Sequence, residues 1–577
     1  MKKVFYIFII LLSLTIGSCS KFLDRTPLDQ VSDPLFWKTD GDLQLYINKL
    51  YDSFNSQAWS TVGSGGGPVP DQGTDVVIAQ GNSISTKNRM DGVVTVPTTG
   101  GGWSWTNVRN VNYFLENADK VTTGTLKDQY TGEAYFFRAW FYFDLLKQFG
   151  DLPIFTSTLS VDQTDLLYSA RSSRTDVVNF IVGDLDLAIA KMKNKTDLAA
   201  GRLNRDVALL FKSRVCLYEG TWEKYHKGTA FAGTTDGSAF LNLAATAAKV
   251  VIDGGHYSLT TGNVKSVYYE LFNQIDLTNN KEVLFWKQYN WNTFSDNFGN
   301  QMWNWPLASG YTREFVRSYL CTDGLPISVS PLYKGDGDLR TVAVNRDPRC
   351  DQTIMKPGDA VMISLKNDTT KFVTPLLTGQ AGPTGYETRK YRRPQLDPLR
   401  GDYSQDLAYI FCRYAEALLN YAEAKAELGQ LTQADVDLSI NKLRQRVGMP
   451  NLNLSSITTD PAWPDYGYTL TPTLQEIRRE RTIEMAAEGH RLNDIMRWRA
   501  HSLFTGKRPR GTKYTDEFKK INAALKQDTE GYLDPYSGAV LGGPGSTWGF
   551  DPNKHYLLPL PTNELTINTK LKQNPGY

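Results

Sequence analysis

One segment, residues 132–149, restricts the possible folds of this chain more than any other. Drawn as an α-helix, it carries aromatic side chains on nearly all of its sides: Tyr135, Phe136, Phe137, Trp140, Phe141, Tyr142 and Phe143. Because a helix that is apolar all round offers no face to water, it must be buried. The segment ends at Gly150-Asp151-Leu152-Pro153, and glycine followed by proline is typical of a helix exit. We therefore expect this helix to be buried within a helical scaffold.

Apolar periodicity predicts further helices in two blocks of the chain. The first block also holds helices near residues 104–118, 175–192, 204–218 and 239–252, with Ser104 as the N-cap of the first. The second block holds helices near residues 406–428, 434–447 and 473–499, and a capping box from Thr473 to Glu476 opens the last of them. Consecutive predicted helices form pairs, and the second helix of a pair starts about 28 residues after the first. This offset indicates stacked helical hairpins, although it differs from the tetratricopeptide repeat of about 34 residues.

Two long segments lack this periodicity. Residues 65–102 are rich in Gly, Ser, Thr and Pro, and residues 285–403 are irregular and aromatic, with a short strand-like run at residues 283–286. Long irregular segments are either functional or disordered, and the aromatic content argues against disorder. The sequence thus predicts a mainly α fold whose helical-hairpin scaffold carries large loops. We expect residues 35–280 and 281–577 to form one integrated body.

The N-terminus has the three parts of an export signal. Met1-Lys2-Lys3 is basic, residues 4–16 are an apolar stretch, and Ile16-Gly17-Ser18 places small residues before Cys19. The apolar stretch spans about 20 Å as a helix, short of the roughly 30 Å hydrocarbon core, so residues 1–18 are predicted to be a cleavable signal. The position of Cys19 is typical of a bacterial lipobox, in which the cysteine is acylated and several acyl chains anchor the protein. The alternative is an ordinary secretory signal with Cys19 there by chance. Residues 19–34 suit a lipid-anchored tether.

Composition excludes one class of partner. The chain has 63 basic and 61 acidic residues, so it has no electrostatic footprint for nucleic acid. Cys216 and Cys412 lie within apolar helical patterns and are expected to be buried thiols. Cys321 and Cys350 are the pair to check for a disulfide, which the sequence alone leaves open.

The familiar catalytic signatures are missing from the sequence. It has no phosphate-binding Gly-Lys-Ser/Thr loop, no Gly-x-Ser-x-Gly nucleophile elbow and no His-Glu-x-x-His motif. None of its five histidines has another histidine at metal-site spacing. We therefore expect no catalytic residues, no metal and no cofactor.

The most enzyme-like stretch carries three acids, Glu480, Glu484 and Glu488, on one helical face. Paired carboxylates can serve glycosidase chemistry. They alternate, however, with four arginines: Arg478, Arg479, Arg481 and Arg491. This pattern favours a salt-bridged helical face with a structural role. A metal site at His490 and Asp494 is a weaker alternative.

Several motifs in order give the chain a resemblance to a known family. They are the lipobox cysteine followed by Phe22-Leu23-Asp24, the residues Arg138-Ala139-Trp140 with the exit at 149–153, the run 414–424, the stretch from Glu480-Arg481 to Gly489-His490-Arg491, Arg497-Trp498, and the terminus with Leu558-Pro559-Leu560-Pro561 and 573–577. Each motif is modest alone, but their order is specific. On these motifs the chain resembles the SusD/RagB family of surface nutrient-binding lipoproteins of Bacteroidetes.

The resemblance implies an α-helical fold built on four tetratricopeptide-like helix pairs. It also implies a location on the outer membrane, lipid-anchored and facing the cell exterior. The implied partner is a SusC-like TonB-dependent transporter, which the lipoprotein covers as a lid. Members bind oligosaccharides or, in the RagB-like branch, peptides, and they are not enzymes.

A glycan is the leading ligand, because sugars stack CH-rich faces on aromatic rings and pair their hydroxyls with polar side chains. No binding residue can be carried over by motif, so aromatic density in the two irregular regions selects the candidates. These are Asp75, Arg89, Trp103, Tyr289, Trp291, Trp303, Trp305 and Tyr311. Trp303 and Trp305 alternate, so in an extended segment both point to one side. A peptide-binding protein and a surface hydrolase are the alternatives.

The lipobox pattern generates the first prediction. Cys19→Ala should release the protein from the membrane fraction, because the acyl chains that Cys19 carries supply the anchoring. Fractionation of cells that lack the transporter partner measures this. Persistent membrane association of the variant in those cells would contradict lipidation at Cys19.

Overall fold

The computed structural model describes residues 36–54, 70–79, 85–290, 309–375, 377, 382–398 and 406–577. Over these residues the chain is mainly helical, as expected, and its strands form three antiparallel pairs. The pairs are β1 (Val77–Ala79) with β3 (Ser309–Tyr311), β2 (Val283–Lys287) with β6 (Tyr409–Arg413), and β4 (Ala360–Ile363) with β5 (Thr369–Lys371). The strand-like run at residues 283–286 is therefore confirmed as β2.

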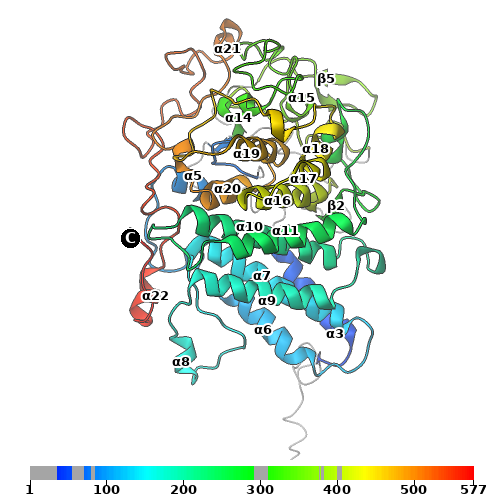
Figure 1. Ribbon diagram of the computed structural model, residues 1–577, viewed down its shortest axis with the longest axis vertical. Coiled ribbons are helices and arrows are strands. Elements are labelled where there is room, and N and C mark those ends of the chain that lie inside the picture. Colours follow the sequence, from blue (N-terminus) through cyan, green and yellow to red (C-terminus); the bar gives the residue numbers. More distant parts are fainter. Residues whose placement is uncertain are drawn as a thin grey trace, which may run out of the picture.

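A stack of helices forms the body of the molecule (Figure 1). Each contacts the next in the order α6 (Thr106–Ala118), α7 (Lys127–Phe149), α9 (Arg174–Lys191), α10 (Arg205–Tyr225), α11 (Ser238–Asp253), α16 (Tyr414–Glu427) and α19 (Pro472–Glu484). Helix α3 (Asp40–Leu50) packs on α6 and α7 at one end of the stack. This arrangement confirms the helical scaffold, and it places α16 and α19 of the second block directly against the first.

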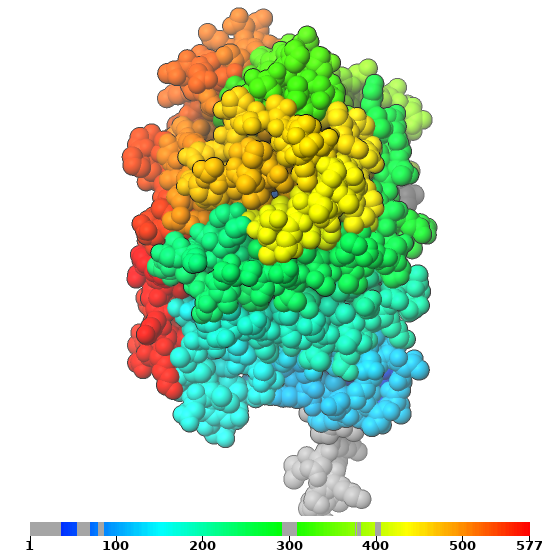
Figure 2. Space-filling model, in the orientation of Figure 1, coloured from blue at the N-terminus to red at the C-terminus, as the bar shows by residue number. Residues whose placement is uncertain are grey.

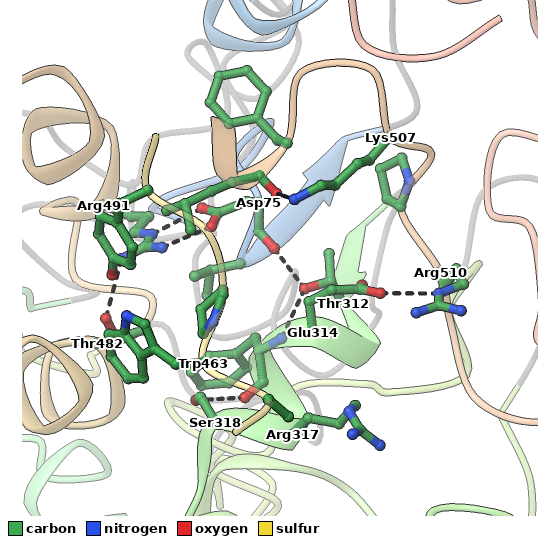
Figure 3. Close-up of a pocket in the computed structure, with 18 of the residues that line it drawn as sticks. Asp75, Thr312, Glu314, Arg317, Ser318, Trp463, Thr482, Arg491, Lys507 and Arg510 are labelled. Atoms are coloured by element: carbon green, nitrogen blue, oxygen red, sulfur yellow. Dashed lines mark hydrogen bonds and ion pairs between the residues drawn. The ribbon is translucent and has the colours of Figure 1, made fainter. Parts of the chain in front are cut away.

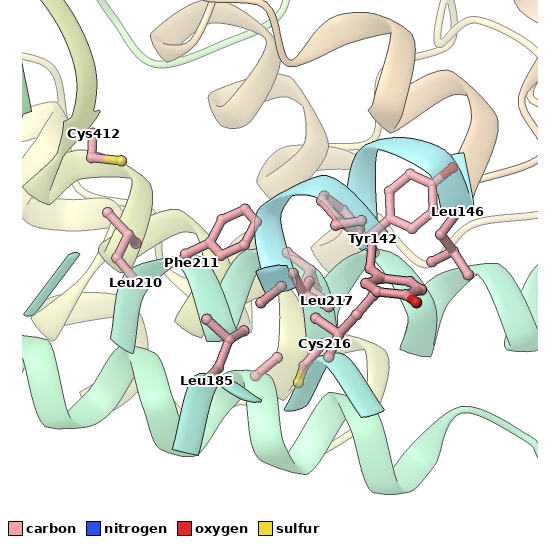
Figure 4. Close-up of a cluster of buried hydrophobic side chains, with 14 of the residues drawn as sticks. Tyr142, Leu146, Leu185, Leu210, Phe211, Cys216, Leu217 and Cys412 are labelled. Carbon is pink, nitrogen blue, oxygen red and sulfur yellow. The ribbon is translucent and has the colours of Figure 1, made fainter. Parts of the chain in front are cut away.

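Helix α7 is buried along its length, as its aromatic sides require. Its Trp140 ring lies 5.0 Å from that of Phe211 on α10, and Figure 4 shows Phe211 among the buried side chains of this region. Gly132 permits a close approach, because a Cβ there would stand 2.7 Å from the Met192 side chain at the end of α9. Gly150 ends the helix with a φ of 74°, a conformation that favours glycine.

The predicted helix at residues 406–428 is wrong in its first part. Residues 409–413 form strand β6, and the helix begins only at Tyr414. The Tyr-Ile-Phe-Cys-Arg run is aromatic and β-branched, so its sequence is compatible with a helix or a strand. Its pairing with β2 selects the strand. The N-cap of α6 also differs, since Trp105 occupies that position and the Ser104 hydroxyl bonds to Thr106 instead.

Two other predicted helices are interrupted. The segment 434–447 is divided at Ser439 into α17 (Gln433–Leu438) and α18 (Ile440–Arg446). The segment 473–499 opens at Thr471, whose hydroxyl caps the helix by accepting from the Leu474 amide, and α19 stops at Glu484. Positive φ angles at Ala487 and Gly489 break the helix before α20 (Arg491–Arg497). Residues in the left-handed conformation cannot continue a right-handed helix. The apolar period alone therefore overestimated the length of the helix predicted at residues 473–499.

Short elements fill the irregular regions and the C-terminal part. They are η2 (Tyr51–Ser53), α5 (Ser85–Met90), α8 (Thr164–Leu167), η3 (Lys195–Asp197), α12 (Val267–Leu271), α14 (Arg313–Ser318), α15 (Pro348–Thr353), η4 (Leu454–Ser456), η5 (His501–Leu503), α21 (Asp516–Ile521) and α22 (Thr562–Ile567). The C-terminal segment, red in Figure 2, runs down one side of the molecule beside the N-terminal helices. The Asn574 amide donates to the Phe149 carbonyl at 3.0 Å, and the Leu558 amide donates to Gln148 at 2.7 Å. These bonds tie the end of the chain to α7.

Three acids of α19 and the turn after it, Glu480, Glu484 and Glu488, pair with cations from other elements and not with the arginines of their own helix. Glu484 has a fully buried side chain and meets the guanidinium groups of Arg349 at 2.9 Å, Arg413 at 2.6 Å and Arg446 at 2.7 Å. Burial raises the pKa of Glu484, but the three guanidinium groups outweigh burial and hold the pKa below its ordinary value. Ion pairing of this stretch is confirmed. The prediction that these acids pair with the arginines of the same helix along one face is wrong, because the acids point into the protein.

Two neighbouring acids extend this network. Glu480 pairs with Arg349 at 2.6 Å and with Arg444 at 3.1 Å. Glu488 pairs with Arg413 and Lys390, each at 2.7 Å. The network therefore connects α15, the segment before residue 391, β6, α18 and α19 through charge-assisted hydrogen bonds.

The cysteines of the described chain are free and buried. Cys321 and Cys350 form no disulfide, and Cys216 and Cys412 are buried as expected, with burial raising each of their pKa values to about 12. Among the described residues, no helix has both the length and the apolar character needed to cross a bilayer. The proposed signal (1–18), Cys19 and the whole tether (19–34) lie outside the described residues.

The buried network generates the second prediction. Glu484→Gln should lower the free energy of unfolding by about 3–5 kcal/mol, because it leaves buried guanidinium groups without a compensating charge. Urea unfolding measures this without changing ionic strength. The exposed Glu270 on α12 offers a matched control, and Glu270→Gln should change stability by less than about 0.5 kcal/mol. Equal stability of the two variants would contradict a structural role for Glu484.

Candidate functional site

A pocket of about 520 Å³ opens where four segments meet. The segments are the turn around Asp75, the start of α14, the loop 460–466 before α19, and the stretch 503–510 after η5. Figure 3 shows the labelled side chains from these segments gathered around one space. Part of its wall comes from Thr482 and Arg479 on α19. The pocket therefore borders the same helix that carries the buried network.

Asp75 is held in place by an ion pair with Arg491, the first residue of α20. The guanidinium donates from Nε at 2.8 Å and from Nη2 at 2.7 Å to the two carboxylate oxygens. A third donor of Arg491 reaches the Thr482 hydroxyl at 3.1 Å. On the other side, the Thr312 amide donates to the Val76 carbonyl at 3.0 Å and so fixes the start of α14. The predicted residue Asp75 is thus a rigid part of the pocket wall.

Two aromatic rings line the pocket from the loop before α19. Trp463 is half-buried and Tyr466 is buried, and their rings lie parallel with centroids 5.8 Å apart. The Arg479 guanidinium stands 5.0 Å from the Trp463 ring and is anchored to Asp460 at 2.7 Å. The Trp463 indole N–H has no hydrogen-bond partner within the described chain. The arrangement offers a fixed aromatic surface beside hydrogen-bonding groups.

Trp463 and Tyr466 were not among the predicted site residues. They lie between predicted helices, in the run Trp463-Pro464-Asp465-Tyr466-Gly467-Tyr468. This run has the same loop-with-aromatics signal that selected the two irregular regions. A search for aromatic residues in every interhelical segment would have found it.

Each carboxylate that lines the pocket forms an ion pair with an arginine. Asp75 binds Arg491, Asp460 binds Arg479, and Glu314 meets Arg510 at 3.0 Å. These ion pairs hold the three carboxylates in fixed positions in the pocket wall.

Other predicted site residues lie in the interior. Arg89 is 6% exposed and donates from Nε to the His555 carbonyl at 2.7 Å and from Nη2 to the Tyr556 carbonyl. Tyr289 and Tyr311 are each 1% exposed, and Tyr311 bonds to Thr388 at 3.1 Å. These three side chains do not line the pocket, so we leave them out of the candidate site. Loop-like composition selected them, but packing against other parts of the chain buries them.

Trp103 belongs to a separate, smaller pocket of about 280 Å³ beside α6. It is 7% exposed, and its ring meets those of Phe149 at 5.0 Å and Trp105 at 5.4 Å in edge-on contacts. The structure therefore does not bring Trp103 to Asp75. Trp291, Trp303 and Trp305 lie outside the described residues, and their role stays a prediction.

No group of three His, Cys, Asp or Glu side chains in the described parts of the chain is arranged to hold a metal ion. The weaker alternative of His490 with Asp494 fails on geometry. The Asp494 carboxylate is occupied by Arg481 and Arg497, each at 2.9 Å. Burial lowers the pKa of His490 well below its ordinary value.

Asp71, which binds the backbone at the start of α20, generates the third prediction. It accepts from the Arg491 amide at 2.8 Å, and burial raises its pKa to about 6. Because this folded-state pKa exceeds the ordinary value of about 3.9, the wild type loses stability as pH rises from 4 through 6, by up to about 3 kcal/mol. Asp71→Asn keeps an acceptor and tolerates the φ of 65°. Its melting temperature relative to wild type should therefore rise from pH 4 to pH 7.

The exposed Asp52 provides a control, and Asp52→Asn should change the melting temperature little. A difference between Asp71→Asn and wild type that stays constant with pH would contradict the raised pKa.

Comparison with known sequences gives consistent matches. A profile described as the SusD family matches residues 271–577, and one described as starch-binding associating with outer membrane matches residues 28–217. SusD-like protein P38 of Formosa agariphila is 25% identical over 512 residues, which are 86% of this chain and 91% of that protein. SusD-like protein P2 of the same organism is 26% identical over 591 residues and covers 100% of both chains.

Solved structures share the fold. A SusD-like protein from Bacteroides fragilis aligns with a TM-score of 0.68 at 23% identity, over 96% of this chain and 100% of its own. A SusD-like carbohydrate binding protein from the same species aligns with a TM-score of 0.70 at 22% identity, over 93% of this chain and 100% of its own. At these identities the likeness establishes the fold alone. Since the family profile matches more than half of the sequence, the chain belongs to the SusD family.

Proposed function

We propose that this protein is a surface lipoprotein that binds a glycan and delivers it to a SusC-like TonB-dependent transporter in the outer membrane. The observation that carries the binding proposal is the pocket in which the Trp463 and Tyr466 rings stand beside fixed charged and hydroxyl groups. Sugar rings present CH-rich faces to aromatic rings and hydroxyls to polar side chains, so this combination suits a glycan.

The pocket is preorganised for binding. The Asp75–Arg491 and Asp460–Arg479 pairs fix two of its walls before a ligand enters. A ligand therefore does not have to order these side chains, which lowers the entropic cost of association. Trp463 is half-buried, and the part of its ring that lines the pocket is available for contact.

Family membership supports delivery without hydrolysis, because the resemblance implies that members of the SusD family are not enzymes. The similar Bacteroides fragilis structure, which is described as a SusD-like carbohydrate binding protein, supports a glycan as the ligand. The profile described as associating with outer membrane, together with the lipobox at Cys19, supports the location. Membership of the SusD family, which the resemblance links to SusC-like transporters, supports the transporter partner.

Removal of the Trp463 ring provides the fourth prediction. Stacking on an aromatic ring contributes about 1–3 kcal/mol, so Trp463→Ala should weaken glycan affinity by roughly 5- to 150-fold. Calorimetry with the lipid-free protein measures this against panels of oligosaccharides and peptides. Tyr168, which is 40% exposed and lines the smaller pocket, supplies the matched control, and Tyr168→Ala should bind normally.

Melting temperatures of both variants separate binding from packing. Normal glycan binding by a folded Trp463→Ala variant would place the site elsewhere. Binding of peptides and of no glycan would refute the proposed ligand class.

A further inference from the structure

The pocket carries more positive than negative side chains. Its lining contains six cations, Arg317, Arg479, Arg491, Lys507, Arg508 and Arg510, and three carboxylates, Asp75, Glu314 and Asp460. The whole chain is nearly balanced, with 63 basic and 61 acidic residues. The excess is therefore a property of this pocket and not of the protein in general.

Most of these cations have nearby carboxylate partners. Three of them neutralise the three lining carboxylates, as described above, and Arg508 pairs with Asp534 at 2.8 Å. Arg510 also lies 3.2 Å from Glu530. Lys507 and Arg317 remain as the cations that these carboxylates do not neutralise.

Lys507 is exposed, and its ammonium group binds only neutral acceptors within the described chain. It donates to the Ser502 carbonyl at 2.8 Å and to the Leu503 carbonyl at 3.1 Å. These bonds, at the end of η5, hold the ammonium group in position without cancelling its charge. An ammonium group has three donors, so one remains for a ligand.

Arg317 is only weakly paired. Its nearest carboxylate is Asp336 at 3.8 Å, and the same carboxylate is bound by Arg313 at 2.7 Å. The Arg317 side chain is 33% exposed. In Figure 3, Lys507 and Arg317 lie on opposite sides of Thr312 and Glu314. Both cations line the pocket that Trp463 also lines.

From this charge distribution we infer that the ligand of this pocket is an acidic oligosaccharide. Its sugar rings contact Trp463, and its anionic groups pair with Lys507 and Arg317. The inference rests on the proposed glycan-binding function and specifies its substrate class. Carboxylates of uronic acids and sulfate esters share the required chemistry, because both are anions that accept hydrogen bonds from ammonium and guanidinium groups.

Calorimetry with three probes of matched length tests the inference: a neutral glucose oligosaccharide, a galacturonate oligosaccharide and a sulfated galactose oligosaccharide. At least one acidic probe should bind more tightly than the neutral one. This preference should shrink as salt rises from about 50 to about 300 mM, because salt screens exposed charges. The probe that binds identifies the source of the anionic group.

Variants then assign the preference to the two cations. Lys507→Gln and Arg317→Gln should each weaken binding of the acidic probe by about 3- to 10-fold and leave the neutral probe unchanged. Lys49, exposed on the remote helix α3, offers a control of equal charge change, and Lys49→Gln should have no effect. Melting curves establish that each variant is folded.

The outcomes separate the inference from the proposed function. Equal or tighter binding of the neutral probe would overturn the acidic class and leave glycan binding intact. An acidic preference that survives both substitutions would also overturn the assigned site. Binding of none of the three probes, nor of any glycan in the wider panel, would overturn the proposed function itself.

Discussion

Glu484 and the three arginine side chains that meet it form the constraint on which much of this structure depends. The arginines come from α15, the end of β6 and the end of α18, which are distant in the sequence. A charge buried without partners costs several kcal/mol, so these segments are stable only when they converge. The network therefore fixes the position of α19 relative to the strands and helices that precede it.

The same helix supports the pocket. While Glu480 and Glu484 point into the network, Arg479 and Thr482 of α19 line the cavity. The left-handed break at Gly489 then turns the chain so that Arg491 reaches Asp75. The buried network and the pocket wall thus use different sides of one short stretch, which explains why the most enzyme-like sequence of the chain is an architectural element.

The sequence by itself determined those elements whose burial or capping follows from their own residues alone. The aromatic sides of α7 require burial in any fold, and Asn204 caps α10 by accepting hydrogen bonds from the Asp206 and Val207 amides wherever that helix lies. The order of the family motifs likewise predicted the scaffold. Among the residues that line the candidate site, Asp75 was predicted from its position in the irregular region 65–102.

Only the tertiary structure decided the features that depend on partners far along the chain. Pairing with β2 turned residues 409–413 into a strand, and packing buried Arg89 and Tyr311 although they lie in loop-like sequence. Trp463 and Tyr466 line a pocket because α14 and the stretch 503–510 supply other parts of its wall. The physical reason is that burial and charge pairing are properties of a position in space, whereas periodicity and capping act between neighbours in the sequence.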